Sequence, residues 1–284
     1  MRVLFVGDVF ATPGLKALRA YLGAYGGDYD LRVVNAENAT GGRGLSEKHF
    51  DQVRDAGADV VTLGNHTFDQ RDTADLLERS THLVRPLNYP PGTPGLGATT
   101  VAVGGTHVTV AQVMGRLFMD PLDDPFRALD DLFASLPEGR PVIVDAHVET
   151  TAESKVLGYH VAGRAAALLG THTHVQTADE QLLNGTAYLT DVGMTGVEAS
   201  SIGVTYDGPY AAFRTQRKHR FTPAEGAATV CAVALELEGT RATSIERIRW
   251  RHDPATGGGA EPGDGRTGHV VRTPDAGAED ARAV

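Results

Sequence analysis

The stretch at residues 3–8, VLFVGD, joins a short apolar run directly to a glycine and a carboxylate. The same arrangement recurs where polar motifs follow further apolar runs: NAEN at 35–38, GNH at 64–66, DAH at 145–147 and GTHTH at 170–174. Apolar runs of this length, bounded by Gly or Pro, are typical of buried parallel strands. Because ligands bind beyond the carboxyl ends of such strands, we expect these polar motifs to meet at one sheet edge.

Helix-like patterns alternate with these runs in the first half of the chain, at residues 12–22, 46–53 and 72–78. Thr12 is the expected N-cap of the first helix, with Pro13 at its first position. This alternation predicts βα units with parallel strands. The second half predicts a hairpin (99–103 with 108–111), helices (125–136 and 152–157) and strands (187–190, 229–237 and 244–251). A second sheet packed on the first, with helices outside, is therefore expected.

The length of 284 residues predicts one large α/β domain, which we place at residues 1–252. Residues 253–284 contain seven Gly and three Pro, and they predict a flexible or loosely packed C-terminal tail. No apolar stretch approaches the roughly 20 residues that span a bilayer, and the first residues do not resemble a signal peptide. The single Cys231 excludes an internal disulfide and is expected to be a small buried residue of a late strand. The expected compartment is the cytoplasm, without a membrane partner.

The formal net charge of −10 argues against broad nucleic-acid binding. Residues 214–220, RTQRKHR, form the one basic cluster. Contact with a phosphate or an RNA backbone is one interpretation of this cluster, and a solvated loop is the favoured one.

Carboxylate, amide and imidazole groups in the strand-end motifs are the donor types of a metal site. A bridging Glu37 would let two ions lie roughly 3.5–4 Å apart. His172 and His174 stand two residues apart, so both would face one side of an extended segment. The six predicted ligands divide between two ions, as Asp8, Glu37 and His174 for the first and Glu37, Asn65, His147 and His172 for the second. Mixed N/O ligation favours Fe, Mn or Zn over Mg or Ca.

Three further residues of the motifs have other expected roles. His66 is adjacent to Asn65 and need not bind the same ion, so it is the predicted general acid that protonates a leaving oxygen. Asn38 is the predicted contact to a phosphoryl oxygen. For Asn35, a turn-forming role is favoured.

The motifs resemble those of the calcineurin-like metallophosphoesterases, and most closely the YmdB-like bacterial phosphodiesterases. The resemblance rests on residues 7–10 (GDVF), 35–39 (NAENA), 64–69 (GNHTFD), 170–179 and 190–196 (TDVGMTG). It implies a four-layer α/β/β/α sandwich of two packed mixed sheets, with a dinuclear centre at the strand ends. Phe10 stands where the wider superfamily usually has a His, and Glu37 where it usually has a bridging Asp; the closer branch shares both departures.

The resemblance implies a dinuclear, metal-dependent phosphodiesterase for cyclic nucleotides, with 2′,3′-cyclic monophosphates preferred. The expected mechanism is attack by a metal-bridging hydroxide, with Fe the first candidate and Mn or Zn the alternatives. The expected partner is a small nucleotide phosphodiester; RNA ends or RNA-processing partners stay open, and a homo-oligomer is expected. The alternatives are a regulator that binds metal or nucleotide without turnover, a phosphomonoesterase, and a dinuclear amide hydrolase.

Overall fold

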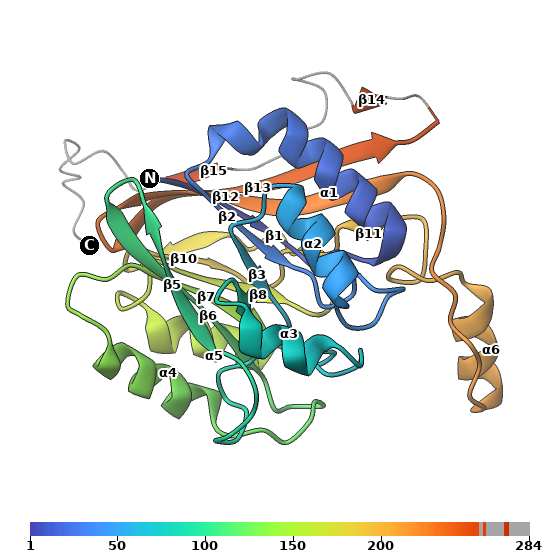
Figure 1. Ribbon diagram of the computed structural model, residues 1–284, viewed down its shortest axis with the longest axis horizontal. Coiled ribbons are helices and arrows are strands. Elements are labelled where there is room, and N and C mark those ends of the chain that lie inside the picture. The colour runs from blue at the N-terminus through green and yellow to red at the C-terminus, as the bar shows by residue number, and fades with distance from the viewer. Residues whose placement is uncertain (256–257, 260–269, 273–284) are drawn as a thin grey trace, which may run out of the picture.

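Two sheets dominate the computed structural model, which describes residues 1–255, 258–259 and 270–272 (Figure 1). Within these residues the first sheet has the order β14-β13-β12-β1-β2-β3-β4, with β11 beside β12 and β15 beside β13. Its strands are β1 (Arg2–Val6), β2 (Leu31–Asn35), β3 (Val60–Thr62), β4 (Leu83–Val84), β11 (Gly196–Val197), β12 (Ala228–Glu238), β13 (Arg241–Asp253), β14 (Gly258–Gly259) and β15 (Val270–Arg272).

The second sheet has the order β5-β6-β7-β8-β10-β9. Its strands are β5 (Ala98–Val103), β6 (Thr106–Met114), β7 (Val142–His147), β8 (Ala167–Thr171), β9 (Gln181–Leu183) and β10 (Thr186–Leu189). β5 and β6 form the predicted hairpin, whereas β6, β7, β8 and β10 pair in parallel. In the first sheet β1 to β4 are parallel and β12 is antiparallel to β1. Both sheets are therefore mixed.

Helices cover the outer face of each sheet, which confirms the predicted four-layer α/β/β/α sandwich. The helices are α1 (Ala11–Tyr25), α2 (Glu47–Asp55), α3 (Thr73–Arg79), α4 (Pro125–Ser135), α5 (Thr151–Val161) and α6 (Asp207–Thr215), with a short 3-10 turn η1 (Gly26–Asp28). α1, α2 and α3 pack on the first sheet, and α4 and α5 pack on the second. α6 projects from the side of the molecule (Figure 1).

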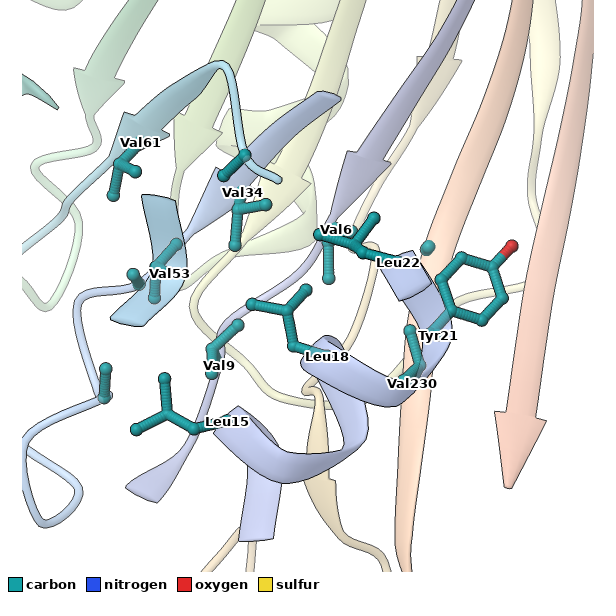
Figure 2. Close-up of a cluster of buried hydrophobic side chains, with 14 of the residues drawn as sticks. Val6, Val9, Leu15, Leu18, Tyr21, Leu22, Val34, Val53, Val61 and Val230 are labelled. Atoms are coloured by element: carbon teal, nitrogen blue, oxygen red, sulfur yellow. The ribbon is translucent and has the colours of Figure 1, made fainter. Parts of the chain in front are cut away.

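Strand alternation explains how one sheet serves two cores. Leu4 and Val6 of β1 belong to the core under α1, while Val3 and Phe5 belong to the core between the sheets. Figure 2 shows Val6 near Leu18 and Leu22 of α1. Complete burial of each such side chain stabilises the fold by roughly 1.5–3 kcal/mol. Since both faces are covered, the strand appears in the sequence as a continuous apolar run.

The start of α1 differs from the prediction. The helix begins at Ala11 rather than after a Thr12 cap, and Phe10 is its N-cap residue without a side-chain cap bond. The N–H groups of Phe10 and Ala11 donate to the carbonyls of Thr195 and Asn38. Tertiary contacts thus fix the helix entry, and no threonine hydroxyl is needed there.

The predicted tail is described only in part. Gly258–Gly259 and Val270–Arg272 pair antiparallel with β13, and β13 itself extends to Asp253, one residue beyond the proposed domain boundary. The other tail residues, 256–257, 260–269 and 273–284, lie outside the described residues. The boundary at 252 stays a prediction. Across the described chain, every helix is too short or too polar to pass through a bilayer.

Cys231 lies buried in β12, as predicted. Burial raises the pKa of its thiol to about 12, so almost no reactive thiolate is present at neutral pH. We expect a thiol reagent at neutral pH to label Cys231 in denaturant and to leave it unmodified in the folded protein. Equal labelling rates in the two states would contradict this burial.

Candidate metal centre

The layer between the two sheets changes from apolar to polar at the carboxyl ends of the strands. Ile143 of β7 belongs to the inter-sheet core, and Asp145 and His147 follow on the same face at two-residue steps. β7 is thus longer than the predicted run of residues 142–144, and both polar residues lie within the strand. Neighbouring strands end in the same manner, with fully buried Asn35, Thr62 and Thr171.

Three possible metal-ligand atoms surround Nε2 of His147, which is itself a fourth. Its Nε2 lies 3.1 Å from Glu37 Oε1, 2.8 Å from Asn65 Oδ1 and 3.1 Å from His172 Nδ1. One ligand atom from each of Glu37, His147 and His172 lies within 4.8 Å of the others. The predicted second ligand set is therefore assembled in one place.

Hydrogen bonds on the far sides of these rings determine which nitrogens face the centre. Thr171 Oγ1 donates its hydrogen to Asp145 Oδ1 (2.7 Å), so it accepts from His147 Nδ1 (2.8 Å). His172 Nε2 lies 2.9 Å from Glu149 Oε2, within ion-pair distance of that carboxylate. The Nε2 atom of His147 thus faces Glu37 Oε1, Asn65 Oδ1 and His172 Nδ1 across one shared space. A cation in that space would satisfy all four.

A second group of donors adjoins the first. His174 Nδ1 donates to the carbonyl of Ile202 (2.9 Å), and its Nε2 lies 3.2 Å from Asn38 Oδ1. Asp8 is completely buried; its Oδ2 accepts from the His172 N–H (3.2 Å), whereas its Oδ1 has no hydrogen-bond partner among the described residues. An orphaned carboxylate oxygen and two facing acceptors are suited to a cation.

Charge in the centre is arranged for cation binding. Burial raises the pKa of Glu37, but His147 and the His66 N–H more than offset this and bring it to about 2. Burial, with the charge of His147, lowers the pKa of His172 to about 3. The pKa of His147 is lowered by burial and raised by Glu37 and Asp8, ending at about 9. Without metal, His147 therefore holds a proton that a bound cation would displace.

The GTHTH motif does not have the predicted extended geometry. His172 and His174 have positive φ angles of 106° and 66°, so the segment is not extended and the argument from two-residue spacing does not apply to it. The loop is held by Asp191, which accepts from both the N–H and the hydroxyl of Thr173 (2.9 and 2.8 Å). Asp191 lies in the TDVGMTG motif, the one sequence signal that pointed to it.

The absence of a side chain at Gly64 leaves room for Glu37 and His147. A Cβ atom at this position would collide with Glu37 Oε2 and with the His147 ring. Any side chain here would occupy the space next to the second ligand set. The GNH motif thus provides Asn65, His66 and the space beside them.

His66 lies at the rim of the centre. Its Nδ1 lies 2.8 Å from Asp69 Oδ2, and Asp69 also accepts from Arg43 Nε (3.0 Å). Its backbone N–H donates to Glu37 Oε2 (3.1 Å), which ties the position of the ring to the centre. Asp69 stands in the GNHTFD motif and Arg43 in the glycine-rich loop at 41–44, but neither motif predicts this pair of contacts to His66 and Asp69.

A pocket of about 380 Å³ opens over these residues. Its polar side includes Glu37, Asn38, Arg43, His66, His172 and His174, and its apolar side includes Phe10, Ile202, Val204, Pro209, Phe213 and Phe221. Phe10 packs its ring edge-on to His174, with centroids 5.6 Å apart. Phe10 therefore supports the ring of His174, a predicted metal ligand.

Asn35 adopts the predicted turn-forming role. Its Oδ1 accepts from the Glu37 N–H (3.1 Å), and its Nδ2 donates to Asp145 Oδ2 (3.0 Å). Of the predicted site residues, Glu37, Asn65, His147 and His172 meet directly, Asp8, Asn38 and His174 adjoin them, and His66 lies at the rim. The buried partners Thr171 and Asp145 stand in the GTHTH and DAH motifs, but their position there does not predict their roles; Glu149 lies outside every motif.

Comparison with known proteins agrees with this architecture. A family model described as YmdB-like protein matches residues 4–248. A Bacillus subtilis protein named 2′,3′-cyclic-nucleotide 2′-phosphodiesterase is 42% identical over 254 residues, covering 87% of this chain and 96% of the relative. The crystal structure of a hypothetical protein from Thermus thermophilus has a TM-score of 0.86 at 48% identity and covers 89% of this chain and 100% of that chain. That of a novel phosphatase from Mycoplasma pneumoniae has a TM-score of 0.84 at 31% identity, covering 89% and 94%. The chain belongs to the YmdB-like protein family.

Proposed function

We propose that this protein is a metal-dependent phosphodiesterase that hydrolyses cyclic nucleotides, with 2′,3′-cyclic monophosphates as its preferred substrates. The observation that carries the proposal is that Glu37 Oε1, Asn65 Oδ1 and His172 Nδ1 all lie 2.8–3.1 Å from His147 Nε2, so that four possible metal-ligand atoms share one space. The name of the Bacillus relative supports the substrate class.

We assign two metal positions. Glu37, Asn65, His147 and His172 would hold one ion; Asp8, Glu37 and His174 would hold the other, and the contact of Asn38 Oδ1 with His174 adds Asn38 to this second set. Asn38, expected to contact the substrate, is therefore assigned as a ligand. Bound here, two ions (Fe first, Mn or Zn as alternatives) would lower the pKa of a water molecule and neutralise charge on phosphoryl oxygens.

His66 would act as the general acid. In hydrolysis the water oxygen bonds to phosphorus while the water loses a proton, and the bond from phosphorus to one ribose oxygen breaks. That oxygen needs a proton, which His66 Nε2 would donate at the pocket wall. Asp69 accepts from His66 Nδ1–H, so it orients the ring with Nε2 on the opposite side.

A substrate panel tests the proposal. The metal-loaded protein should hydrolyse 2′,3′-cyclic mononucleotides faster than 3′,5′-cyclic nucleotides, linear phosphodiesters, phosphomonoesters or peptides. Faster release of phosphate from monoesters would indicate the phosphomonoesterase, and peptide cleavage the amide hydrolase. Nucleotide binding without product over hours would indicate the regulator.

Thr171 gives a separate test of the metal assignment. Thr171→Val removes the acceptor of His147 Nδ1–H and a donor to Asp145, so we expect metal affinity to fall about 10–100-fold. Thr171→Ser should restore most of that affinity. Competition with a chelator measures it. The control is Thr186→Val, which removes another buried hydroxyl away from the centre. Equal losses in Thr171→Val and Thr186→Val would contradict the assigned role.

A further inference from the structure

Residues 206–221, which we call the basic-aromatic arm, differ from the rest of the chain in charge and exposure. The arm comprises α6 and the segment after it, and it contains one acidic residue against four Lys/Arg in a chain of net charge −10. Its four aromatic side chains are 49–73% exposed: Tyr206, Tyr210, Phe213 and Phe221. Exposed cations and aromatic rings are therefore concentrated in this segment, and the Arg214 guanidinium lies 5.7 Å from the centroid of the Tyr210 ring.

The arm makes little contact with the body of the protein. Pro209 is the one buried residue of α6, and the helix projects from the side of the molecule (Figure 1). A nine-residue helix is marginal in water without packing. Two aromatic side chains kept in solvent on such a helix, Tyr210 and Phe213, mark a binding surface together with Tyr206 and Phe221 beside it.

The arm is continuous with the candidate active site. Pro209, Phe213 and Phe221 line the same pocket as His66 and Glu37. A ligand that leaves the pocket on this side meets the remaining aromatic and basic residues of the arm. The surface is thus placed to recognise an extension of the substrate.

Charge selects the class of ligand. The side chains of Arg217, Lys218 and Arg220 are exposed, and none forms an ion pair with an acidic residue in the described part of the chain. Three unpaired cations on an acidic protein attract a polyanion locally. Aromatic rings between such cations are the means by which proteins bind single-stranded nucleic acid, because bases stack on rings while phosphates contact cations.

We propose that the basic-aromatic arm binds the strand of an oligoribonucleotide whose 3′ end, a 2′,3′-cyclic phosphate, enters the pocket. The inference rests on the proposed function. A 2′,3′-cyclic phosphate occupies the 2′ and 3′ oxygens of its ribose and leaves the 5′ oxygen free to continue the strand. The same chemistry at phosphorus then serves a mononucleotide and an RNA end, and the arm favours the RNA end.

Binding by metal-depleted protein tests this without turnover. The probe is a short fluorescent oligoribonucleotide ending in a 2′,3′-cyclic phosphate, followed by anisotropy at several salt concentrations, with a 2′,3′-cyclic mononucleotide as competitor. The triple variant Arg217→Ala, Lys218→Ala, Arg220→Ala should bind the probe on the order of tenfold more weakly at low salt and reduce the slope of log Kd against log salt by about 2. Tyr210→Ala should weaken binding about tenfold with the slope unchanged.

The matched control replaces exposed cations on α1, α2 and α4, namely Arg19, Lys48 and Arg127, and should bind the probe as the parent does. The proposal is overturned if the first triple variant binds like the parent, or if the oligonucleotide binds no more tightly than the mononucleotide. A change in sedimentation mass with unaltered RNA affinity would also overturn it and assign the arm to a contact between copies of the chain. Hydrolysis of the mononucleotide by metal-loaded protein is measured separately, so loss of catalysis with intact strand binding refutes the proposed function alone.

Discussion

Glu37→Ala is expected to remove both metal ions and to lower kcat for a 2′,3′-cyclic mononucleotide at least about 10³-fold, equivalent to about 4 kcal/mol. Glu37 is the one carboxylate assigned to both positions, and its Oε1 lies 3.1 Å from His147 Nε2. Its loss removes negative charge where the cations would bind and leaves the imidazole donors without a shared anion. Elemental analysis and steady-state kinetics on the same preparation measure the two effects.

The control for this variant is Glu138→Gln, which neutralises an exposed acid in the segment after α4. It should keep the metal content and rate of the parent. Circular dichroism and thermal melting establish that Glu37→Ala is folded, because burial of Glu37 makes a folding defect the competing explanation. A folded Glu37→Ala protein with full metal occupancy would contradict the ligand assignment.

His66→Ala is expected to have the opposite pattern, with metal content retained and kcat lowered about 10²–10⁴-fold. The ring contacts Asp69 and the pocket, and it stands outside the group of Glu37, His147 and His172. Its proposed work is to protonate a poor leaving group. The leaving group of a p-nitrophenyl phosphodiester needs no proton. For that substrate, kcat of His66→Ala should therefore fall less than about tenfold.

His107→Ala, an exposed histidine in β6, is the control and should behave as the parent with both substrates. An equal loss of rate with the ribose and p-nitrophenyl leaving groups would show that His66 acts in substrate binding or in ordering the site. Loss of metal from His66→Ala would place the residue among the ligands and refute the role of general acid.

The strands, and the meeting of the motif residues at one edge, could be predicted because they follow from short-range regularities. Apolar runs such as residues 3–6 are buried on both faces, and their polar neighbours must emerge at the strand ends. The shared carboxyl edge then brings Glu37, Asn65 and His147 together, whatever the details of the loops. Two-residue alternation along β7 also explains why Asp145 and His147 lie on the same face of that strand.

The conformation of the loops could not be predicted in this way. Residue spacing says nothing of the positive φ angles at His172 and His174, or of the hydrogen bond from the Thr173 N–H between them to Asp191. The start of α1 at Ala11 likewise depends on the distant carbonyl of Asn38. These interactions join segments remote in sequence, so no local pattern reveals them.

The basic cluster shows the same limit. From sequence, a solvated loop is the favoured interpretation of residues 214–220, and residues 216–220 are exposed after α6. Sequence alone did not reveal that exposed aromatic residues surround this cluster or that Phe213 and Phe221 line the pocket of the candidate site. Exposure of a phenylalanine is a property of the folded chain.

Titration of metal into stripped protein tests the central claim most directly. Protein depleted of metal by a chelator would receive increasing amounts of Mn²⁺ or Fe²⁺ while hydrolysis of a 2′,3′-cyclic mononucleotide is followed. The two assigned positions predict no hydrolysis without metal and a rate that reaches its plateau at about two ions per chain. Full hydrolysis by the stripped protein, or no hydrolysis at any metal content, would contradict the account.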